Sequence, residues 1–160
     1  MRKTVQYWLM KSEPSEFSID DLKAKKRWHW DGVRNYEARN FMRDEMHIGD
    51  LIIFYHSNAI PSGPAGVARV ASLPYPDFTQ FNKDSKYFDP KATNKEPRWF
   101  MVDVTFVKRF LRTISRNELQ QKRALHNMKL WKRPRLSITP LSKNEFNVII
   151  SIAEMNSHTR

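Results

Sequence analysis

The 160-residue sequence has no cysteine, only four glycines and no long apolar run. The missing cysteine excludes a disulfide framework, a thiolate zinc site and a cysteine nucleophile. No glycine belongs to a phosphate-binding loop, because none precedes the Gly-Lys-Ser or Gly-Lys-Thr of that motif. No segment approaches the roughly 20 apolar residues of a membrane span, and Tyr7–Met10 is too short for a signal-peptide core. We therefore expect a soluble protein that is cytoplasmic or, in a eukaryote, nuclear.

Catalytic and metal-binding signatures are also sparse. The five histidines are scattered without a His-x-x-x-His pair, so we expect no metal site and no cofactor. His56 and Ser57 are adjacent, but neighbouring residues on a strand point to opposite faces, and no nucleophile elbow surrounds them. These observations favour a protein that is not an enzyme.

Positive charge dominates the composition. The chain has 28 Lys and Arg against 17 Asp and Glu, which gives a net charge of +11. Such a surface attracts polyanions and releases their counterions on contact. The aromatic residues, 12% of the chain, are interleaved with the cations and are suited to stacking on bases, which favours nucleic acid over a membrane as the partner. The alternative is a basic solvated surface with no polyanionic partner.

Apolar runs predict the strands of the fold. Tyr7–Met10 and Leu51–Tyr55 are continuous apolar segments of strand length, and Gly66–Ala71 is expected to return from the second as a wide hairpin. Trp99–Val107 alternates residue by residue, as a strand does. Residues 74–98 contain four prolines and little periodicity, so we expect a long loop or lid there rather than a domain boundary.

Capping signals predict the helices. Asn35 is a candidate N-cap for a helix over Tyr36–Met46. Three further pairs have the spacing of a capping box: Ser18 with Asp21, Ser115 with Glu118, and Ser142 with Glu145. Because short helices and strands do not alternate regularly, the sequence predicts an α+β fold with a strongly bent sheet or small barrel. The length fits a single domain, which we place at residues 1–156, followed by a C-terminal tail at 157–160.

Polar residues stand where the apolar segments end or begin. They form three groups: Lys11-Ser12-Glu13, Gly32-Val33-Arg34-Asn35-Tyr36 and His56-Ser57-Asn58. If these groups converge, they supply what a base-reading pocket needs: a carboxylate such as Glu13 for an exocyclic amine, amides such as Asn35 or Asn58 for ring atoms, and an aromatic ring for stacking. The alternative is that the polar residues cap turns and the tryptophans fill the core.

A series of short motifs runs through nearly the whole chain. In order they are Tyr7-Trp8-Leu9-Met10-Lys11-Ser12-Glu13-Pro14, Trp30, Gly32-Val33-Arg34-Asn35-Tyr36, Ala38-Arg39-Asn40-Phe41-Met42, Gly49-Asp50, Phe54-Tyr55-His56-Ser57-Asn58, Gly66-Val67-Ala68, Pro97-Arg98-Trp99, Val102-Asp103-Val104 and Arg135-Leu136-Ser137. Together they resemble the motif series of the EVE domain family, and their joint occurrence in this order is specific.

The resemblance implies a fold and a ligand class. It implies a PUA-like fold, in which a bent, mostly antiparallel sheet closes into a pseudo-barrel with short helices at the periphery. The EVE domain is similar in build to the YTH domain, a reader of methylated adenine in RNA. Its members are associated with modified bases, notably modified cytosine in DNA. The resemblance therefore implies a nucleic-acid partner carrying a modified base.

Carried over to this sequence, the resemblance implies a set of site residues. The expected base-binding pocket comprises Lys11, Ser12, Glu13, Trp30, Arg34, Asn35, Tyr36, His56, Ser57, Asn58, Trp99, Arg135 and Ser137. The expected phosphate contacts are Lys25, Lys26, Arg27, Arg39 and Arg43. Arg34 stands where a YTH domain has a cage tryptophan, so a complete methyl-adenine cage is not expected, although a guanidinium plane can stack on a base.

Our leading hypothesis from the sequence is a non-enzymatic, monomeric module that takes one modified nucleobase into this pocket, with modified cytosine in DNA favoured. Two alternatives remain at this point. One is a small RNA- or DNA-processing enzyme that uses Glu13 or His56 as a general base in the same pocket. The other is an RNA-binding accessory protein, since the sequence does not separate DNA from RNA.

Overall fold

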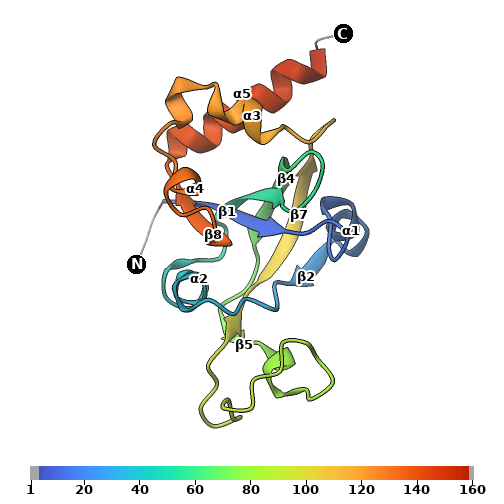
Figure 1. The fold of residues 1–160 in the computed structure, drawn as a ribbon, viewed down its shortest axis with the longest axis vertical. Coiled ribbons are helices and arrows are strands. Elements are labelled where there is room, and N and C mark those ends of the chain that lie inside the picture. Colours follow the sequence, from blue (N-terminus) through green and yellow to red (C-terminus); the bar gives the residue numbers. More distant parts are fainter. Residues whose placement is uncertain (1–3, 159–160) are drawn as a thin grey trace.

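The computed structural model describes residues 4–158, and its centre is a six-stranded mixed sheet (Figure 1). The strand order is β2-β7-β4-β3-β1-β8, so β2 and β8 are the edges. The strands of this sheet are β1 (Tyr7–Ser12), β2 (Arg27–His29), β3 (Leu51–His56), β4 (Gly63–Val70), β7 (Asp103–Arg109) and β8 (Ile138–Leu141). A separate two-stranded ribbon pairs β5 (Tyr75–Pro76) with β6 (Phe100–Met101). With short helices around it, this architecture confirms the α+β prediction.

The pairing of the strands is antiparallel except at β1 and β3. These two strands run parallel, with Tyr7 opposite Leu51 and Ser12 opposite His56. A parallel pair needs a long crossover, which here contains α1, β2 and α2. The carboxyl ends of β1 and β3 therefore lie side by side at the same end of these strands, where the Ser57 N–H donates to the Ser12 carbonyl at 3.0 Å.

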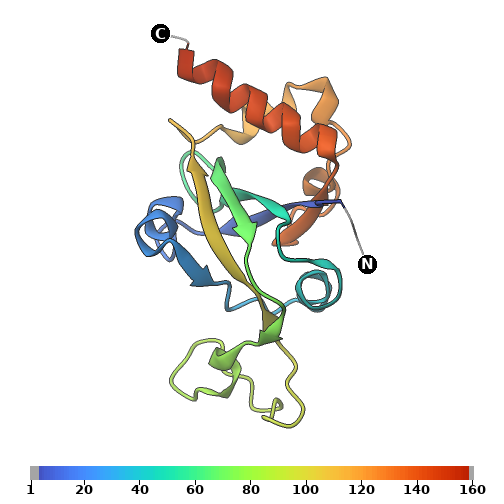
Figure 2. The same ribbon diagram turned by 180° about the vertical axis from the view of Figure 1, so that it is seen from behind.

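The sheet is strongly bent, as expected. In Figure 1, β1 runs across the view while β7 runs up it, and Figure 2 shows the same crossing from behind. This crossing is the twist that accumulates from strand to strand across a sheet.

One hydrophobic core lies on each face of the sheet. The first packs Trp8, Ile52 and Phe54 against α1 (Ile19–Lys25) and α2 (Tyr36–Asn40). The second packs Leu9 and Ile53 of the same strands, which alternate to the other face, against a C-terminal helical layer. That layer comprises α3 (Arg116–Gln120), the 3-10 turn η3 (Arg123–Leu125), α4 (Lys129–Lys132) and α5 (Lys143–His158).

The capping signals place the helix starts correctly. The capping boxes at Ser18 and Ser115 are both formed, and Ser142 exchanges its hydrogen bonds with Glu145 at 2.9 and 3.0 Å. Asn35 caps α2, but the helix expected over Tyr36–Met46 does not remain an α-helix. After Asn40 it widens into a π-helical turn, η1 (Phe41–Glu45), in which the Met46 N–H donates to the Phe41 carbonyl.

The proline-rich segment 74–98 is an ordered excursion that projects beyond the sheet (Figure 1). It begins with β5 and the 3-10 turn η2 (Phe78–Phe81). Fully buried Gln80 organises its base: its amide nitrogen donates to the carbonyls of Asp77 and Trp99, and its amide oxygen accepts from the N–H groups of Arg98 and Trp99. This satisfied amide keeps the two ends of the excursion together.

At the C-terminus, α5 continues to His158 and so extends past the boundary that we expected at residue 156. The last two residues of the expected tail, 159–160, lie outside the described residues, as do residues 1–3 of the expected domain. Within the described chain, every helix is too short or too polar to cross a bilayer.

Candidate functional site

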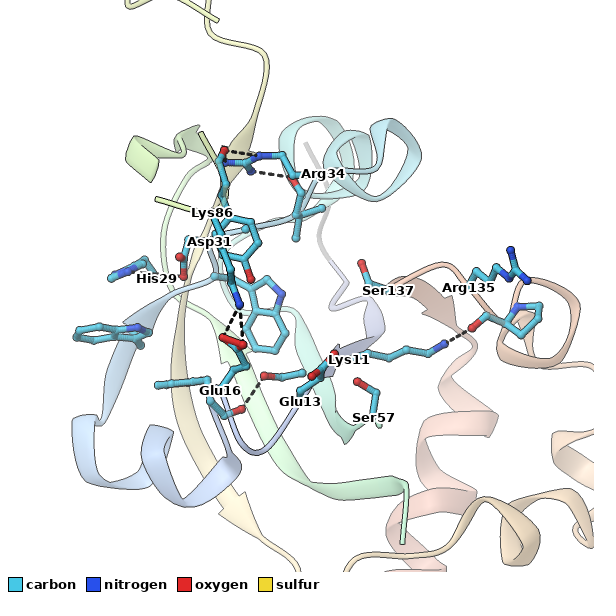
Figure 3. Close-up of a pocket in the computed structure, with 18 residues that line it drawn as sticks. Lys11, Glu13, Glu16, His29, Asp31, Arg34, Ser57, Lys86, Arg135 and Ser137 are labelled. Carbon is cyan, nitrogen blue, oxygen red and sulfur yellow. Dashed lines mark hydrogen bonds and ion pairs between the residues drawn. The ribbon is translucent and has the colours of Figure 1, made fainter. Parts of the chain in front are cut away.

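A pocket of about 560 Å³ lies where β1 and β3 end and β8 begins (Figure 3). We call it the strand-end pocket. Five separate stretches of the chain supply its lining: Lys11, Ser12, Glu13, Glu16 and Phe17; Trp28, His29, Trp30, Asp31, Gly32, Val33 and Arg34; Ser57; Lys86 and Tyr87; and Pro134, Arg135 and Ser137. Its size and mixture of aromatic and polar groups are typical of a site for a small organic ring.

Eight of the thirteen expected base-binding residues line this pocket. They are Lys11, Ser12, Glu13, Trp30, Arg34, Ser57, Arg135 and Ser137. The strand register explains their convergence, because the parallel pair aligns the ends of β1 and β3. The antiparallel pair of β1 with β8 then brings the start of β8 to the same place, where the Lys11 N–H donates to the Ser137 carbonyl.

The other five expected residues, Asn35, Tyr36, His56, Asn58 and Trp99, are not part of the pocket lining. The Asn35 side chain accepts from the Ala38 N–H at 3.0 Å, so it serves as the α2 cap. His56 Nε2 accepts from the N–H of Ile19 at the start of α1, and burial lowers the pKa of this histidine. Asn58 adopts a left-handed backbone conformation in the turn that follows β3.

Tyr36 and Trp99, both expected in the base-binding pocket, stack on each other instead. Their ring centroids are 4.8 Å apart and their planes differ by 19°. The guanidinium of Arg39 lies over both rings, and Trp99 Nε1 donates to Asp89 at 2.7 Å. This stack fixes α2 to the base of the 74–98 excursion, outside the strand-end pocket.

Arg34 lines the pocket but its guanidinium is fully engaged with the protein. It donates to the Tyr87 carbonyl at 2.7 and 3.0 Å, to Asp77 at 3.1 Å and to the Thr79 hydroxyl at 3.0 Å. Asp77 is completely buried and also accepts from the Gly32 N–H at 2.7 Å. Arg34 therefore anchors the excursion to the pocket wall, rather than offering a free plane for a base.

Asp31 is a pocket carboxylate that the sequence interpretation did not select. Burial raises its pKa, with His29 opposing that rise from 3.7 Å away. A carboxylate made harder to ionise by its surroundings is a common feature of binding and catalytic sites. The sequence signal that could have identified Asp31 is its position between Trp30 and Gly32, two residues of the motif series.

Tyr87 forms a second unpredicted wall of the pocket. Its ring lies so close to Gly32 that a Cβ atom built on this glycine would be 2.7 Å from the ring carbons. Gly32 also has a φ of +84°, a conformation that favours glycine. No sequence pattern in residues 74–98 pointed to Tyr87, because its position depends on contacts with Arg34 and Gly32 that are distant in the sequence.

The five residues expected to contact phosphate are dispersed, and most have protein partners. Lys25 lies 4.6 Å from the Trp28 ring, and Arg27 pairs with Asp103 at 3.1 Å. Arg43 is held by Asp44, and Arg39 donates to Asn40 and to the Arg98 carbonyl. Lys26 is the left-handed C-cap of α1. Their role in phosphate binding remains a prediction.

Among residues 4–158, no group of three or more His, Asp and Glu side chains has the arrangement of a metal site.

Comparison with known proteins assigns the family. The model of the EVE domain matches residues 6–152. Human thymocyte nuclear protein 1 is 42% identical over 173 aligned residues, which cover 96% of this chain and 76% of the human protein. Among solved structures, this chain is similar to a hypothetical protein from Leishmania major, with a TM-score of 0.96 and 47% sequence identity. The match covers 99% of this chain and 100% of the Leishmania major chain. The human THYN1 protein, solved in complex with DNA containing 5-methylcytosine, matches with a TM-score of 0.88 and 43% identity, covering 93% of this chain and 98% of that one. The chain belongs to the EVE domain family.

Proposed function

We propose that this protein binds DNA and holds one modified cytosine in the strand-end pocket. The observation that carries the proposal is the pairing of carboxylates with aromatic walls in that pocket, in a chain 43% identical to a human protein solved with 5-methylcytosine-containing DNA. A base inside a duplex cannot reach such a pocket unless it is flipped out of the stack.

The pocket chemistry matches the edge of cytosine. The exocyclic amine of cytosine is a donor, and the carboxylates of Asp31 and Glu13 are acceptors that line the pocket. The ring acceptors of cytosine need donors, which the hydroxyls of Ser57 and Ser137 supply. Trp30, which is 7% exposed and in edge contact with Phe54, offers a rigid surface for stacking.

The proposal is for a binding module that acts where DNA is found, which in a eukaryotic cell includes the nucleus. The name of the human relative agrees with that location. Two polar groups of the pocket are already engaged: the Ser12 hydroxyl donates to the Phe17 carbonyl at 2.6 Å, and Lys11 Nζ donates to the Pro134 carbonyl at 2.7 Å. Neither is paired with a general base as a catalytic nucleophile would be.

Binding to a matched set of oligonucleotides tests the proposal. The set contains DNA and RNA, single- and double-stranded, with cytosine, 5-methylcytosine or 5-hydroxymethylcytosine at one position. We expect the protein to prefer a modified cytosine in DNA. Glu13→Gln and Asp31→Asn should each weaken binding of the modified-cytosine DNA by roughly 5- to 150-fold, the range expected for one base contact of about 1–3 kcal/mol.

Glu96→Gln is the matched control, because it removes one negative charge from an exposed residue outside the pocket. Equal affinity for cytosine and modified cytosine in the unaltered protein would refute the proposal. Conversion of excess oligonucleotide to a product would show instead that the pocket belongs to an enzyme.

A further inference from the structure

A second, smaller hollow of about 240 Å³ lies in the C-terminal helical layer. It is lined by Arg116, Gln120, His126 and Trp131, and we call it the Trp131 hollow. The guanidinium of Arg116 lies 5.3 Å from the Trp131 ring, and Trp131 Nε1 donates to the Leu125 carbonyl at 2.7 Å. The hollow therefore has a fixed aromatic floor with an exposed cation beside it.

The hollow is lined from the most basic segment of the sequence. Between residues 108 and 135 the sequence contains ten Lys or Arg and a single carboxylate, Glu118. Glu118 is engaged by Arg112 at 2.6 and 2.7 Å. Five exposed cations of this stretch form no ion pair with any described residue: Lys122, Arg123, Lys129, Lys132 and Arg135. Unpaired cations are available to phosphate, whereas Arg27 and Arg43 would first have to leave a carboxylate.

The Trp131 hollow lies close along the chain to a residue of the strand-end pocket. Trp131 is only four residues from Arg135, which lines that pocket, and four extended residues span at most about 14 Å. Lys11 lines the strand-end pocket from β1, with its ammonium 5.9 Å from the Tyr55 ring. Burial and then the charge of Arg116 lower the pKa of Lys11, so these two cations act on each other.

We propose that the Trp131 hollow and the unpaired cations around it hold the phosphate backbone of the DNA strand that leaves the strand-end pocket. This inference rests on the proposed function. One strand of DNA advances 3.4 Å per nucleotide along the duplex axis, so the hollow would hold phosphates within about four nucleotides of the recognised base. Affinity then comes from the helical layer, and base preference from the strand-end pocket.

The test is binding of a duplex with one 5-methylcytosine, and of the same duplex with cytosine, over a range of salt concentrations. Arg116→Gln should lower affinity for both duplexes several-fold and reduce the slope of log affinity against log salt by about one phosphate contact. Arg116→Lys should keep that slope. Gln120→Glu, which places a carboxylate inside the hollow, should weaken binding further.

Two controls change charge outside the hollow. Asn117→Glu adds the same charge to a neighbouring exposed residue of α3, and Arg69→Gln removes one from the exposed position of β4. Both should weaken binding less than Gln120→Glu and Arg116→Gln. If the hollow variants match these controls, the inference is overturned even though methyl preference persists. If methyl preference is absent but Arg116→Gln still lowers the salt slope, the proposed function fails and the phosphate site stands.

Discussion

Lys86 and Glu16 form an ion pair from opposite sides of the strand-end pocket. Lys86 Nζ lies 2.6 and 2.9 Å from the two carboxylate oxygens of Glu16 (Figure 3). The pair joins the 74–98 excursion to the turn between β1 and α1, and both side chains are more than half exposed. Both residues line the pocket, so under the proposed function a bound base would lie beside this pair.

Breaking the Lys86–Glu16 pair should accelerate release of the base with little change in protein stability. Exposed ion pairs contribute little to folding because water screens them. Lys86→Gln and Glu16→Gln have opposite effects on charge, so they should shift the salt dependence of affinity in opposite directions. Both should nonetheless increase the dissociation rate, measured by stopped-flow fluorescence. Opposite changes in that rate would show that charge alone governs access.

Removing Arg34 should destabilise the whole protein, because it leaves the carboxylate of Asp77 buried without its cation. Loss of one partner of a buried pair typically costs about 3–5 kcal/mol, and we expect the lower end since Arg34 is partly exposed. Urea unfolding of Arg34→Gln measures the loss. Arg43→Gln is the control, since its pair with Asp44 is exposed and should contribute less than about 1 kcal/mol. Similar losses for both variants would contradict the anchoring role.

Substitution of two glycines with positive φ distinguishes the cost of backbone strain from the cost of a steric clash. Gly49 has a φ of +99°, and a Cβ built there meets nothing within 4 Å. Gly49→Ala should therefore lose only the roughly 1–2 kcal/mol of left-handed strain. Gly32→Ala adds a clash with the Tyr87 ring, so the loss of stability measured by thermal unfolding should be larger than for Gly49→Ala. DNA binding should also weaken, because the ring is displaced. Equal losses would mean that the Tyr87 ring moves aside without cost.

Asp31 should make the protein less stable at neutral pH than its amide variant. Burial raises its pKa in the folded protein above the ordinary 3.8. Between the pKa of Asp31 in the unfolded chain and its higher pKa in the folded protein, the folded state binds more protons than the unfolded state. Stability therefore falls as pH rises through that window. Asp31→Asn should therefore raise the free energy of unfolding at pH 7, and this gain should disappear as pH falls to 3.8.

Urea unfolding of both proteins from pH 7 to pH 3.5 measures the difference. Asp84→Asn controls for the loss of one negative charge at an exposed residue. A gain that persists unchanged at the lowest pH would contradict the account. Asp31→Asn should also weaken binding of the modified-cytosine DNA. A residue that contributes to binding but lowers stability is expected to behave in this way.

The sequence was most informative where the determinants are local. The Ser18 capping box, the Asn35 cap and the apolar run of β3 each depend on residues within a few positions, and each prediction was confirmed. Local signals also explain the error over Tyr36–Met46. The apolar stripe of that helix continues without a break, so it gives no signal of the π-helical turn, in which Met42 is buried in the first core.

The pocket was predictable only where it follows strand ends. Ser12 and Ser57 were found because polar residues after apolar runs mark such ends, and the register brings them together. Tyr87 and Lys86 were missed because the excursion has no periodicity and its course is set by Asp77 and Gln80. Tyr36 and Trp99 were assigned to the base because aromatic residues beside cations suit both stacking on a ligand and stacking on each other.

The five separate stretches that line the strand-end pocket have a thermodynamic consequence. They run from Lys11 to Ser137, so the pocket does not exist until almost the entire chain has reached its native topology. Occupancy is then linked to global unfolding, and any compound that fills the site raises the melting temperature according to its concentration and affinity. A modified nucleoside too weak for direct binding measurements would still reveal itself in a melting curve.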